Sequence, residues 1–388
     1  MMGGAPDRDV LRNLVRFMKS RDYLETSRFP SLRRPLWMLP LEPHVMLKYF
    51  GRRTSPFTPS AIPHLYGRVW RKLHGTTDIL YRLFYLNRPV RTDDLHGVMD
   101  DRMYDSLLQA GIAHEAGNDV VSDCRLVPWG GSIFLSDPDQ GDTRTTEHYV
   151  YVGSDSVLLA DFVKREMLNR DYSRGLDLCA GTAFQGHSIK PYCSGVLAAE
   201  YNPRAVDFAR TTLYANDMTE DFEIVQSDLW ERVTGSFDLI VSNPPYYPVD
   251  ESKRDATILD VFGGSDHGME KPLIIFDGLG QYLDRGGEAA ILAASPVIDG
   301  EDVLLERLRT PAARHGLETV LVPWKYTNIK LEPEYQVKHG IDYLIHYIVF
   351  ARRTGAGDVA IAPYPALVRM FEKLQIHAQK WLPSWPEG

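Results

Sequence analysis

Four segments within residues 175–248 decide the fold: GLDLCAGTAFQGHS (175–188), VLAAEYNPRAVDFART (196–211), IVQSDLW (224–230) and FDLIVSNPPYYP (237–248). Each contains a short apolar run that leads to an acid or a turn residue, and helical patterns separate the runs. This alternation predicts an α/β fold with a doubly wound parallel sheet. Asp177, Glu200, Asp228 and Asn243 stand at the predicted strand ends. Because ligands of such sheets bind there, we expect these four side chains to line one cleft.

The tetrapeptide Asn243–Tyr246 (NPPY) carries the most specific functional signal. Two prolines directly after a buried strand stiffen the backbone and remove two donors, so we expect carbonyl groups and the Asn243 amide to face the cleft beside Tyr246. The small-residue turn at Ala180 and Gly181 is a weaker signal, and an acid at a strand end is often only a turn former or a helix cap. Glu200 follows that turn by roughly 20 residues, the spacing that ribose recognition requires.

These motifs resemble a known family. DLCAGTAFQG (177–186), the Glu200 position, SDL (227–229) and NPPY resemble motifs I to IV of class I S-adenosylmethionine-dependent methyltransferases. The most similar branch alkylates nitrogen on a flat conjugated group, as do the glutamine methyltransferases of release factors and the adenine amino-methyltransferases of DNA and RNA. Residues 261–279, VFGGSDHGMEKPLIIFDGL, resemble the glycine-rich segment and helix that follow NPPY in the release-factor branch. The resemblance covers residues 150–352.

Motif I departs from the family pattern at its outer positions. The family carries three alternating glycines there, whereas this chain has Cys179, Gly181 and Ala183. Both replacements are small, so the backbone can still approach a cofactor closely.

The resemblance implies a Rossmann-like sheet of seven strands, S-adenosylmethionine as cofactor, and no metal. It implies that Glu200 binds the ribose hydroxyls, Asp228 the adenine amino group and Asp177 the methionine end. The expected cofactor-binding residues are Asp177, Cys179, Ala180, Gly181, Ala183, Glu200, Tyr201, Asn202, Asp228, Leu229 and Asn243. In the expected chemistry, Asn243 and the Pro244 carbonyl accept hydrogen bonds from the acceptor nitrogen, and Tyr246 stacks on its flat group.

Two other functions stay open on the sequence. The same cofactor site could serve a non-methylating alkylation or cyclisation in small-molecule biosynthesis, or it could be a vestigial, non-catalytic pocket. The intact NPPY motif argues against the vestigial pocket. The sequence encodes neither the acceptor, which could be a protein, a nucleotide or a metabolite, nor the oligomeric state.

Composition bounds the class of protein. The chain has 388 residues, of which 44% are hydrophobic, and this is enough for one large core or two modest ones. No apolar run reaches membrane-spanning length, and the first ten residues lack the apolar core of a signal peptide. Cys124, Cys179 and Cys193 have neither disulfide nor metal-ligand spacing, which favours a reducing cytoplasm.

The charge distribution is uneven. Residues 1–88 hold 16 Lys or Arg against 6 Asp or Glu, whereas the remaining residues hold 27 against 46. The acidic catalytic part disfavours nucleic acid as a partner. The basic part could meet an acidic partner, although its arginines could equally pair with acids of the same chain or be solvated.

Residues 1–75 are predicted to be a helical segment rich in proline and aromatic residues. Residues 8–20 predict an amphipathic helix whose apolar face is Val10, Leu14, Phe17 and Met18. The stretch after it could be a lid over the substrate or could pack between domains. The lid would be walled by Trp37, Met38, Phe50 and Tyr66.

Residues 76–136 predict a winged-helix-like module, with three helices and a strand pair that turns at Gly117 and Asn118. Its recognition segment would be residues 101–111, where two aspartates accompany a single basic residue, Arg102. Phosphate contact requires several cations, so we expect a substrate-side domain or docking scaffold instead of a DNA-binding domain.

The remaining boundaries follow from composition. Residues 137–149 predict a domain boundary or a surface loop, and Asp155 with Ser156 is expected to cap the helix that opens the catalytic domain. Beyond NPPY we expect a helix, a fifth strand and two last strands, which the resemblance implies are an antiparallel pair; the connection between these two could close over the substrate. Their expected ranges are 272–283, 288–294, 317–323 and 343–351. Residues 353–388 predict a helical tail in which Trp381 and Trp385 pack onto the body.

Overall fold

The computed structural model describes residues 7–21, 23, 76–138, 149–248, 265–327 and 333–362. They belong to two compact units, of which the first comprises Met1–Asp171 and Cys179–Val233 and the second Tyr172–Leu178 and Thr234–Gly388. The predictions for the lid walls Trp37, Met38, Phe50 and Tyr66 and for the tail residues Trp381 and Trp385 lie outside the described residues.

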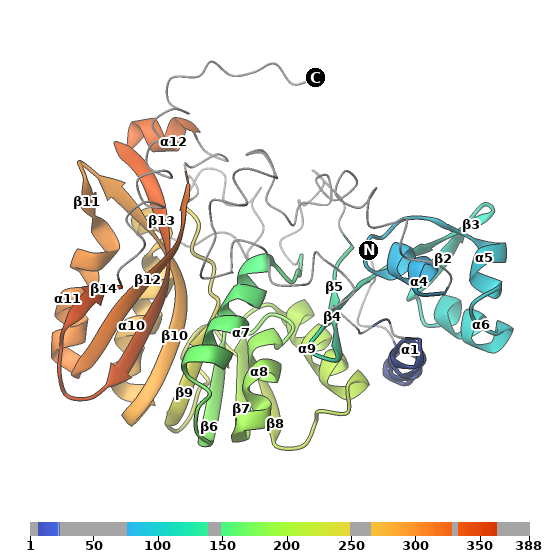
Figure 1. Ribbon diagram of the computed structural model, residues 1–388, viewed down its shortest axis with the longest axis horizontal. Coiled ribbons are helices and arrows are strands. Elements are labelled where there is room, and N and C mark those ends of the chain that lie inside the picture. The colour runs from blue at the N-terminus through green and yellow to red at the C-terminus, as the bar shows by residue number, and fades with distance from the viewer. Residues whose placement is uncertain are drawn as a thin grey trace. The chain divides into compact units, whose positions relative to one another are not determined.

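The second unit is built on a mixed sheet with the strand order β14-β12-β13-β10-β9-β6, and β11 pairs with β10 (Figure 1). Its strands are β6 (Tyr172–Leu178), β9 (Phe237–Ser242), β10 (Leu283–Ile298), β11 (Glu301–Asp302), β12 (Leu317–Thr327), β13 (Ile341–Arg353) and β14 (Val359–Ile361). Strands β6, β9 and β10 run parallel, whereas β13 is antiparallel to both of its neighbours. The expected antiparallel pair at the end of the fold is therefore confirmed.

Helices α10 (Glu270–Tyr282) and α11 (Val303–His315) pack on β10 and on each other. They bury Ile275, Phe276 and Leu279 from α10 and Leu304, Leu308 and Ala312 from α11. Residues 289–294 of β10 are all buried, as is usual for a strand covered on both faces. The unit also contains the short 3-10 helix η7 (Asp266–Gly268) and α12 (Pro333–Lys338).

The first unit contains the parallel strands β7 (Cys193–Glu200) and β8 (Phe222–Gln226). Its helices in this part are α7 (Ser154–Glu166), α8 (Phe184–Ile189), η5 (Lys190–Tyr192) and α9 (Pro203–Ala215). Helix α9 packs on both strands. It begins at Asn202, whose side-chain oxygen accepts a hydrogen bond from the Arg204 backbone nitrogen at 3.0 Å, with Pro203 in the first turn.

The amino-terminal part of the first unit has the expected three helices and strand pair. The elements are α4 (Thr76–Phe84), β1 (Val90–Arg91), α5 (Thr92–His96), α6 (Asp101–Gln109), β2 (Ala113–Ala116) and β3 (Asp119–Ser122). The three strands form an antiparallel sheet in the order β1-β3-β2. Gly117 occupies the predicted turn with φ +67°. The winged-helix assignment itself stays a prediction.

A second hairpin, β4 (Arg125–Trp129) and β5 (Ser132–Ser136), forms its own two-stranded sheet and hydrogen-bonds to α9. The Ile133 backbone nitrogen lies 3.0 Å from Asn216 Oδ1, and the Leu135 nitrogen lies 3.2 Å from Thr212 Oγ1. Within the first unit, this hairpin is therefore bonded to the helix that follows Glu200.

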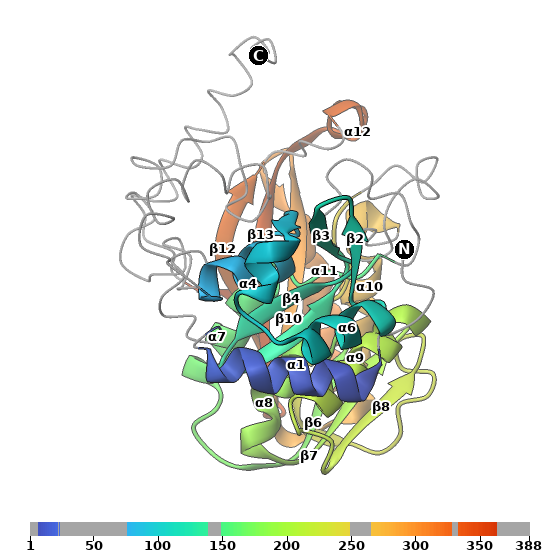
Figure 2. The same ribbon diagram turned by 90° about the vertical axis from the view of Figure 1, so that its right-hand side faces the viewer.

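Helix α1 (Arg8–Ser20) confirms the predicted opening helix and packs on α9 (Figure 2). Its buried face differs from the predicted one, because Val10 and Phe17 are only half-buried. The residues buried from α1 are Leu11, Leu14, Val15 and Met18. The buried face of α1 is thus rotated by about one residue from the predicted face, because packing against α9 determines which residues are buried.

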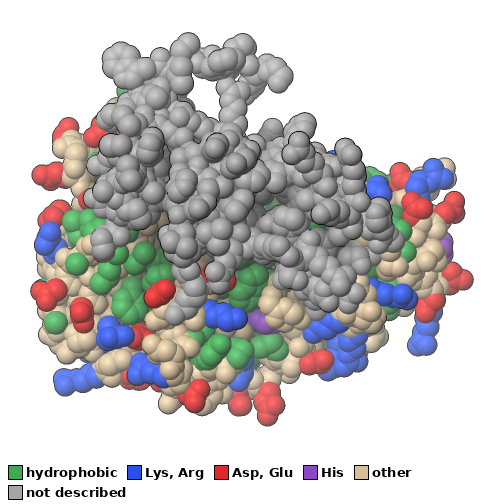
Figure 3. Space-filling model, viewed as in Figure 1, with side chains coloured by type: hydrophobic (Ala, Val, Ile, Leu, Met, Phe, Trp, Pro, Cys, Tyr) green, Lys and Arg blue, Asp and Glu red, His purple; other side chains and the backbone are tan. Residues whose placement is uncertain are grey.

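Basic residues of α1 pair with acids of the same unit. Arg12 and Arg16 both form ion pairs with Asp217, and the Tyr214 hydroxyl donates to Asp9 at 2.6 Å. Over the described part of the face in Figure 3, Lys and Arg side chains alternate with Asp and Glu. These contacts favour intrachain pairing as the role of the α1 arginines.

The described residues have a class I methyltransferase-like α/β fold with a mixed central sheet. The seven expected strands correspond to β6, β7, β8, β9, β10, β12 and β13, and the structure adds β11 and β14. None of the helices in the described ranges is long and apolar enough to cross a membrane.

Candidate cofactor and acceptor site

The motif I turn, Cys179 to Ala183, follows β6 and uses left-handed backbone at three positions. The φ angles are +61° at Cys179, +54° at Gly181 and +60° at Ala183. The Ala180 nitrogen donates to the Ala199 carbonyl at 3.1 Å, which fastens the turn to the end of β7. Cys179 and Ala183 therefore adopt the backbone conformation of the glycines that they replace, at a cost of about 1–2 kcal/mol per residue.

Glu200 connects this turn to the start of α9. Its Oε2 accepts from the Gly181 backbone nitrogen at 2.7 Å and its Oε1 from the Asn202 nitrogen at 2.8 Å. An ionised carboxylate has about four acceptor positions, so this side chain can accept more than one hydrogen bond on each oxygen. Among the described residues, no atom lies within 4 Å of a Cβ built on Gly181, so none of them fills the space beside the turn at this point.

Two buried polar atoms near Glu200 also fit a polar ligand. Thr182 Oγ1 and Asn202 Nδ2 have no hydrogen-bond partner among the described residues. Buried polar groups are usually satisfied, and a ligand with several hydroxyl and amino groups would satisfy these. The residues present therefore fit a nucleoside cofactor.

Asp228 lies next to Glu200 within the first unit. The nitrogen of Ser227 donates to the Glu200 carbonyl at 2.9 Å, and Asp228 follows as an exposed residue. Leu229 has φ +45°, and its carbonyl accepts from Ser227 Oγ at 2.9 Å. Tyr201 is 55% exposed. The structure thus brings together the first-unit residues that the sequence predicted for the cofactor.

Asp177 and Asn243 belong to neighbouring strands of the second unit. Leu178 lies opposite Ser242 in the parallel pair of β6 and β9, and Ser242 Oγ donates to the Leu178 carbonyl at 2.6 Å. Asp177 is fully buried, and Asn243 follows directly after the paired end of β9. The prediction that Asp177 and Asn243 line one cleft with Glu200 and Asp228 joins residues of both units and stays a prediction.

NPPY leaves β9 with Pro244 buried and with Asn243 and Tyr246 half-buried. The Tyr246 ring meets the His346 ring edge to face, with centroids 6.0 Å apart and planes at 81°. The Trp324 ring also packs on His346, and the two ring centroids are 5.2 Å apart. Burial and the charge of Lys325 hold the pKa of His346 well below its usual range, so the ring is neutral at pH 7.

A β-bulge delivers Trp324 to this cluster. Pro323 pairs with Tyr347 and Lys325 with His346, so Trp324 is the inserted residue between them. Bulges commonly re-aim a side chain beside an active site. No local pattern in the sequence indicates Trp324 or His346 as site residues, because a bulge depends on strand register.

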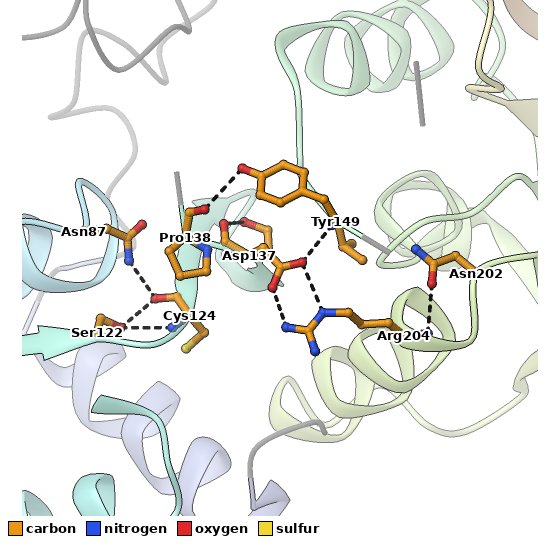
Figure 4. Close-up of polar contacts among 10 residues, drawn as sticks. Asn87, Ser122, Cys124, Asp137, Pro138, Tyr149, Asn202 and Arg204 are labelled. Atoms are coloured by element: carbon orange, nitrogen blue, oxygen red, sulfur yellow. Dashed lines mark hydrogen bonds and ion pairs between the residues drawn. The ribbon is translucent and has the colours of Figure 1, made fainter. Parts of the chain in front are cut away.

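A buried ion pair supports the start of α9 (Figure 4). The Asp137 carboxylate accepts from the Arg204 guanidinium and, at 2.8 Å, from the Val150 backbone nitrogen. The guanidinium also lies over the Phe208 ring, 4.6 Å from its centroid. Asp137 is only 7% exposed, so the prediction of a surface loop is wrong at this residue. Arg204 stands two residues after Asn202, so the pair lies at the first turn of α9.

The predicted side-chain cap of α7 is also wrong. The cap position is Gly153, no side chain caps the helix, and Asp155 Oδ1 instead accepts from the adjacent Ser156 nitrogen at 3.0 Å. The Ser156 carbonyl accepts from Gln185 Nε2 at 2.7 Å, which joins α7 to α8.

His187 in α8 is a buried histidine whose ring lies 4.9 Å from that of Phe134. Its two ring nitrogens have no hydrogen-bond partner in the described part of the chain. Burial and the charge of Lys19 lower its pKa to about 4, so it is neutral at pH 7. The described residues include no group of three His, Cys, Asp or Glu side chains that could hold a metal ion.

Comparison with known proteins agrees with this arrangement. Residues 152–264 match the methyltransferase small domain family. The chain is 34% identical over 157 residues to a Methanocaldococcus jannaschii protein provisionally named protein N5-glutamine methyltransferase MJ0928, and the match covers 40% of this chain and 76% of that protein. It is 24% identical over 137 residues to the release factor glutamine methyltransferase of Agrobacterium fabrum, covering 33% of this chain and 47% of the relative.

A third relative is the ribosomal RNA small subunit methyltransferase C of Actinobacillus pleuropneumoniae, at 29% identity over 144 residues. That match covers 36% of this chain and 37% of the relative. The chain thus spans less than half the length of the release-factor and ribosomal relatives that it matches here.

The chain belongs to the class I S-adenosylmethionine-dependent methyltransferases, in the branch that contains these N5-glutamine methyltransferases. It is accordingly a methyltransferase, and its cofactor is S-adenosylmethionine. These two predictions are confirmed, and the non-methylating alternative is not favoured.

Proposed function

We propose that the enzyme methylates a nitrogen atom of a planar group, and that this group is a glutamine carboxamide in a protein. The observation that carries the proposal is NPPY at the end of β9, with Tyr246 half-buried against the edge of the neutral His346 ring. A planar acceptor can stack on such a tyrosine while the Asn243 amide oxygen and the Pro244 carbonyl accept from its N–H groups.

The proposed cofactor contacts involve residues of the first unit and, from the second unit, Asp177. Glu200 accepts hydrogen bonds from both ribose hydroxyls through the carboxylate that also binds the Gly181 and Asn202 nitrogens. Asp228 accepts from the adenine amino group, and the turn residues Cys179, Ala180 and Ala183 let the backbone approach the ligand. Asp177 takes the methionine end. Tyr201 and Leu229 border the adenosine.

S-adenosylmethionine, when bound, supplies an electrophilic methyl group on a positively charged sulfur. The protein therefore has to position the acceptor and stabilise developing charge. Asn243 holds the acceptor N–H so that the nitrogen lone pair points to the methyl group. Tyr246 presents its ring face to the positive charge that develops on the acceptor. Neutral His346 supports that ring without adding a competing positive charge.

The relatives and the charge distribution together favour a protein acceptor. Two of the three relatives described above are named as glutamine methyltransferases. Residues 89–388 hold 27 Lys or Arg against 46 Asp or Glu, and such a surface repels a nucleic-acid backbone. Methylation of RNA instead of protein would therefore contradict the proposed acceptor.

The remaining finer assignments are part of the proposal. Residues 76–136 would form the winged-helix-like docking module, residues 150–352 the catalytic domain, and residues 1–75 and 353–388 the flanking segments. The three free cysteines fit a protein of a reducing cytoplasm.

The test uses S-adenosylmethionine labelled with tritium in the methyl group, incubated with the full chain and either a cell protein extract or purified ribosomal RNA. We expect S-adenosylhomocysteine as product and label in protein. Acid hydrolysis should release labelled methylamine, because an N-methylated glutamine amide breaks down to glutamate and methylamine. Label recovered in a nucleoside after nuclease digestion would contradict the protein acceptor. Methylthioadenosine without S-adenosylhomocysteine would contradict methyl transfer altogether.

A further inference from the structure

The turn at Ser265–Met269 lies directly against the backbone of the NPPY segment in the second unit. A Cβ added to Gly268 would come 2.7 Å from the Pro248 nitrogen, 2.7 Å from the Tyr247 carbonyl carbon and 2.8 Å from the Tyr246 oxygen. Real Cβ atoms do not approach backbone atoms so closely. Gly268 is therefore in van der Waals contact with the three residues that follow the NPP tripeptide.

This turn holds an unusual backbone to reach that position. Asp266, His267 and Gly268 have consecutive φ angles of +54°, +58° and +85°. Only glycine adopts this region without a steric penalty, so Asp266 and His267 are strained. Strain of this kind persists where the surroundings enforce it, and it is concentrated at functional sites.

Polar contacts hold the strained turn in place. The Ser265 nitrogen donates to Glu270 Oε2 at 2.6 Å, and Arg307 of α11 binds Asp266 Oδ1 at 3.0 Å. His267 Nδ1 lies 3.0 Å from the Tyr335 hydroxyl of α12. The turn is thus fastened to three helices of the unit: α10, α11 and α12.

Helix α12 also shares a packing partner with the residue that follows NPPY. Tyr247 and Tyr335 both pack against the buried pair Ile341 and Leu344. Tyr246 meanwhile turns its ring toward His346. The backbone of residues 246–248 therefore lies against Gly268, Tyr247 packs on the Ile341–Leu344 cluster, and the Tyr246 ring packs on His346.

We propose that the Ser265–Met269 turn is a positioning element that fixes the Tyr246–Pro248 backbone, and that Gly268 is its decisive residue because any side chain there would displace that backbone. The turn touches no acceptor atom. It acts through Tyr246, whose ring must lie in the correct plane for the acceptor to stack. The consequence for catalysis rests on the proposed function, whereas the consequence for the backbone does not.

The test compares Gly268→Ala with Gly286→Ala in the full chain. Gly286 has a similar φ of +76°, but a Cβ there meets no atom within 4 Å, so the control carries the same conformational penalty without the close approach. Hydrogen exchange of the Tyr246 and Tyr247 amides should accelerate in Gly268→Ala and stay at the wild-type rate in Gly286→Ala. Equal exchange in both variants would overturn the proposal.

A second experiment on the same variants measures single-turnover methyl transfer to a synthetic peptide with a central glutamine. Misplacement of a reacting group by about 1 Å costs about 100-fold in rate, so we expect a loss of that order in Gly268→Ala, with an unchanged Kd for S-adenosylmethionine. A normal rate in a variant with accelerated exchange would contradict the positioning role. If the wild-type enzyme leaves the peptide unmethylated, the proposed function fails, and the exchange measurement still decides on the turn.

A milder variant covers the case in which Gly268→Ala does not fold. Tyr335→Phe removes only the hydroxyl that meets His267 Nδ1 and keeps the ring on Ile341 and Leu344. We expect a smaller acceleration of exchange at Tyr246 and Tyr247 in this variant. Wild-type exchange at both amides in Tyr335→Phe would contradict the role of the turn.

Discussion

The Glu200 carboxylate lies 2.7 Å from the backbone nitrogen of Gly181, so the end of β7 and the motif I turn hold each other in place. The same carboxylate receives the Asn202 nitrogen on its other oxygen. A single side chain therefore organises the turn and the start of α9.

Replacing Glu200 by Gln should weaken S-adenosylmethionine binding by about 10- to 100-fold, because a hydrogen bond to a charged group contributes about 1.5–3 kcal/mol. The amide would also turn an NH2 group toward the Gly181 or Asn202 backbone donor. Calorimetric titration measures the change. Glu223→Gln, at an exposed position of β8, is the control and should leave the Kd unchanged. Equal Kd values for both variants would remove Glu200 from the cofactor site.

Ala183→Gly should be tolerated far better than the same change at Ala205. Both alanines are buried, so both variants lose one buried methyl group. Ala183 has φ +60°, whereas Ala205 lies inside α9. Glycine relieves about 1–2 kcal/mol of strain at the first position but costs about 1 kcal/mol in a helix interior. The free energy of unfolding, measured with urea, should therefore be about 2 kcal/mol higher for Ala183→Gly than for Ala205→Gly. Equal values would contradict the strained turn.

Asn243→Ala should lower the rate constant of methyl transfer by about 100-fold with little change in cofactor affinity, because a positioning group acts mainly in the transition state. Tyr246→Phe keeps the ring face and should be mild, whereas Tyr246→Ala should be severe. Single-turnover kinetics at saturating cofactor separate the three variants. A comparable loss in Tyr246→Phe and Tyr246→Ala would point to the hydroxyl instead of the ring.

Arg204→Met should destabilise the protein by about 3 kcal/mol, because it leaves the buried Asp137 carboxylate without its cation. The control lies in the same helix, where Arg210 pairs with Asp207 at 3.9 Å and both side chains are about half exposed. Arg210→Met should cost less than about 1 kcal/mol, as is typical of surface ion pairs. Thermal or urea unfolding measures both, and a similar loss in the two variants would refute the buried anchor.

His187 should make stability depend on pH in the acid range. Its folded pKa is about 4, and the unfolded value is about 6.5, so the unfolded chain takes up the proton first as the pH falls. Stability is therefore lost from about pH 6.5 down to pH 4, by about 2 kcal/mol between pH 6.5 and 5. In urea unfolding at a series of pH values, the free energy of unfolding of His187→Phe should fall less steeply with decreasing pH than that of the wild type. His346 contributes to the pH dependence of stability in both proteins. An identical pH dependence in wild type and variant would therefore show that His187 is not the buried titrating group.

The strand-end acids, the helical opening segment and the positions of the strands were predictable because each depends on a local pattern. The run that ends at Glu200 and the one that ends at Asn243 are apolar strands with a polar terminus, and the structure has β7 and β9 there. Even the replacement of two motif I glycines was compatible with the turn, since Cys179 and Ala183 adopt left-handed backbone.

By itself, the sequence determined the family, the cofactor and the positions of the strands, because hydrophobic periodicity and short motifs act within a few residues. Tertiary structure alone decided the buried face of α1, the burial of Asp137 against Arg204 and the cluster of Tyr246, Trp324 and His346. It also decided that Gly268 meets the NPPY backbone. Each of these depends on which distant segment docks, on strand register or on a bulge, and such long-range choices are made by the packing of the whole unit and leave no local periodic signal.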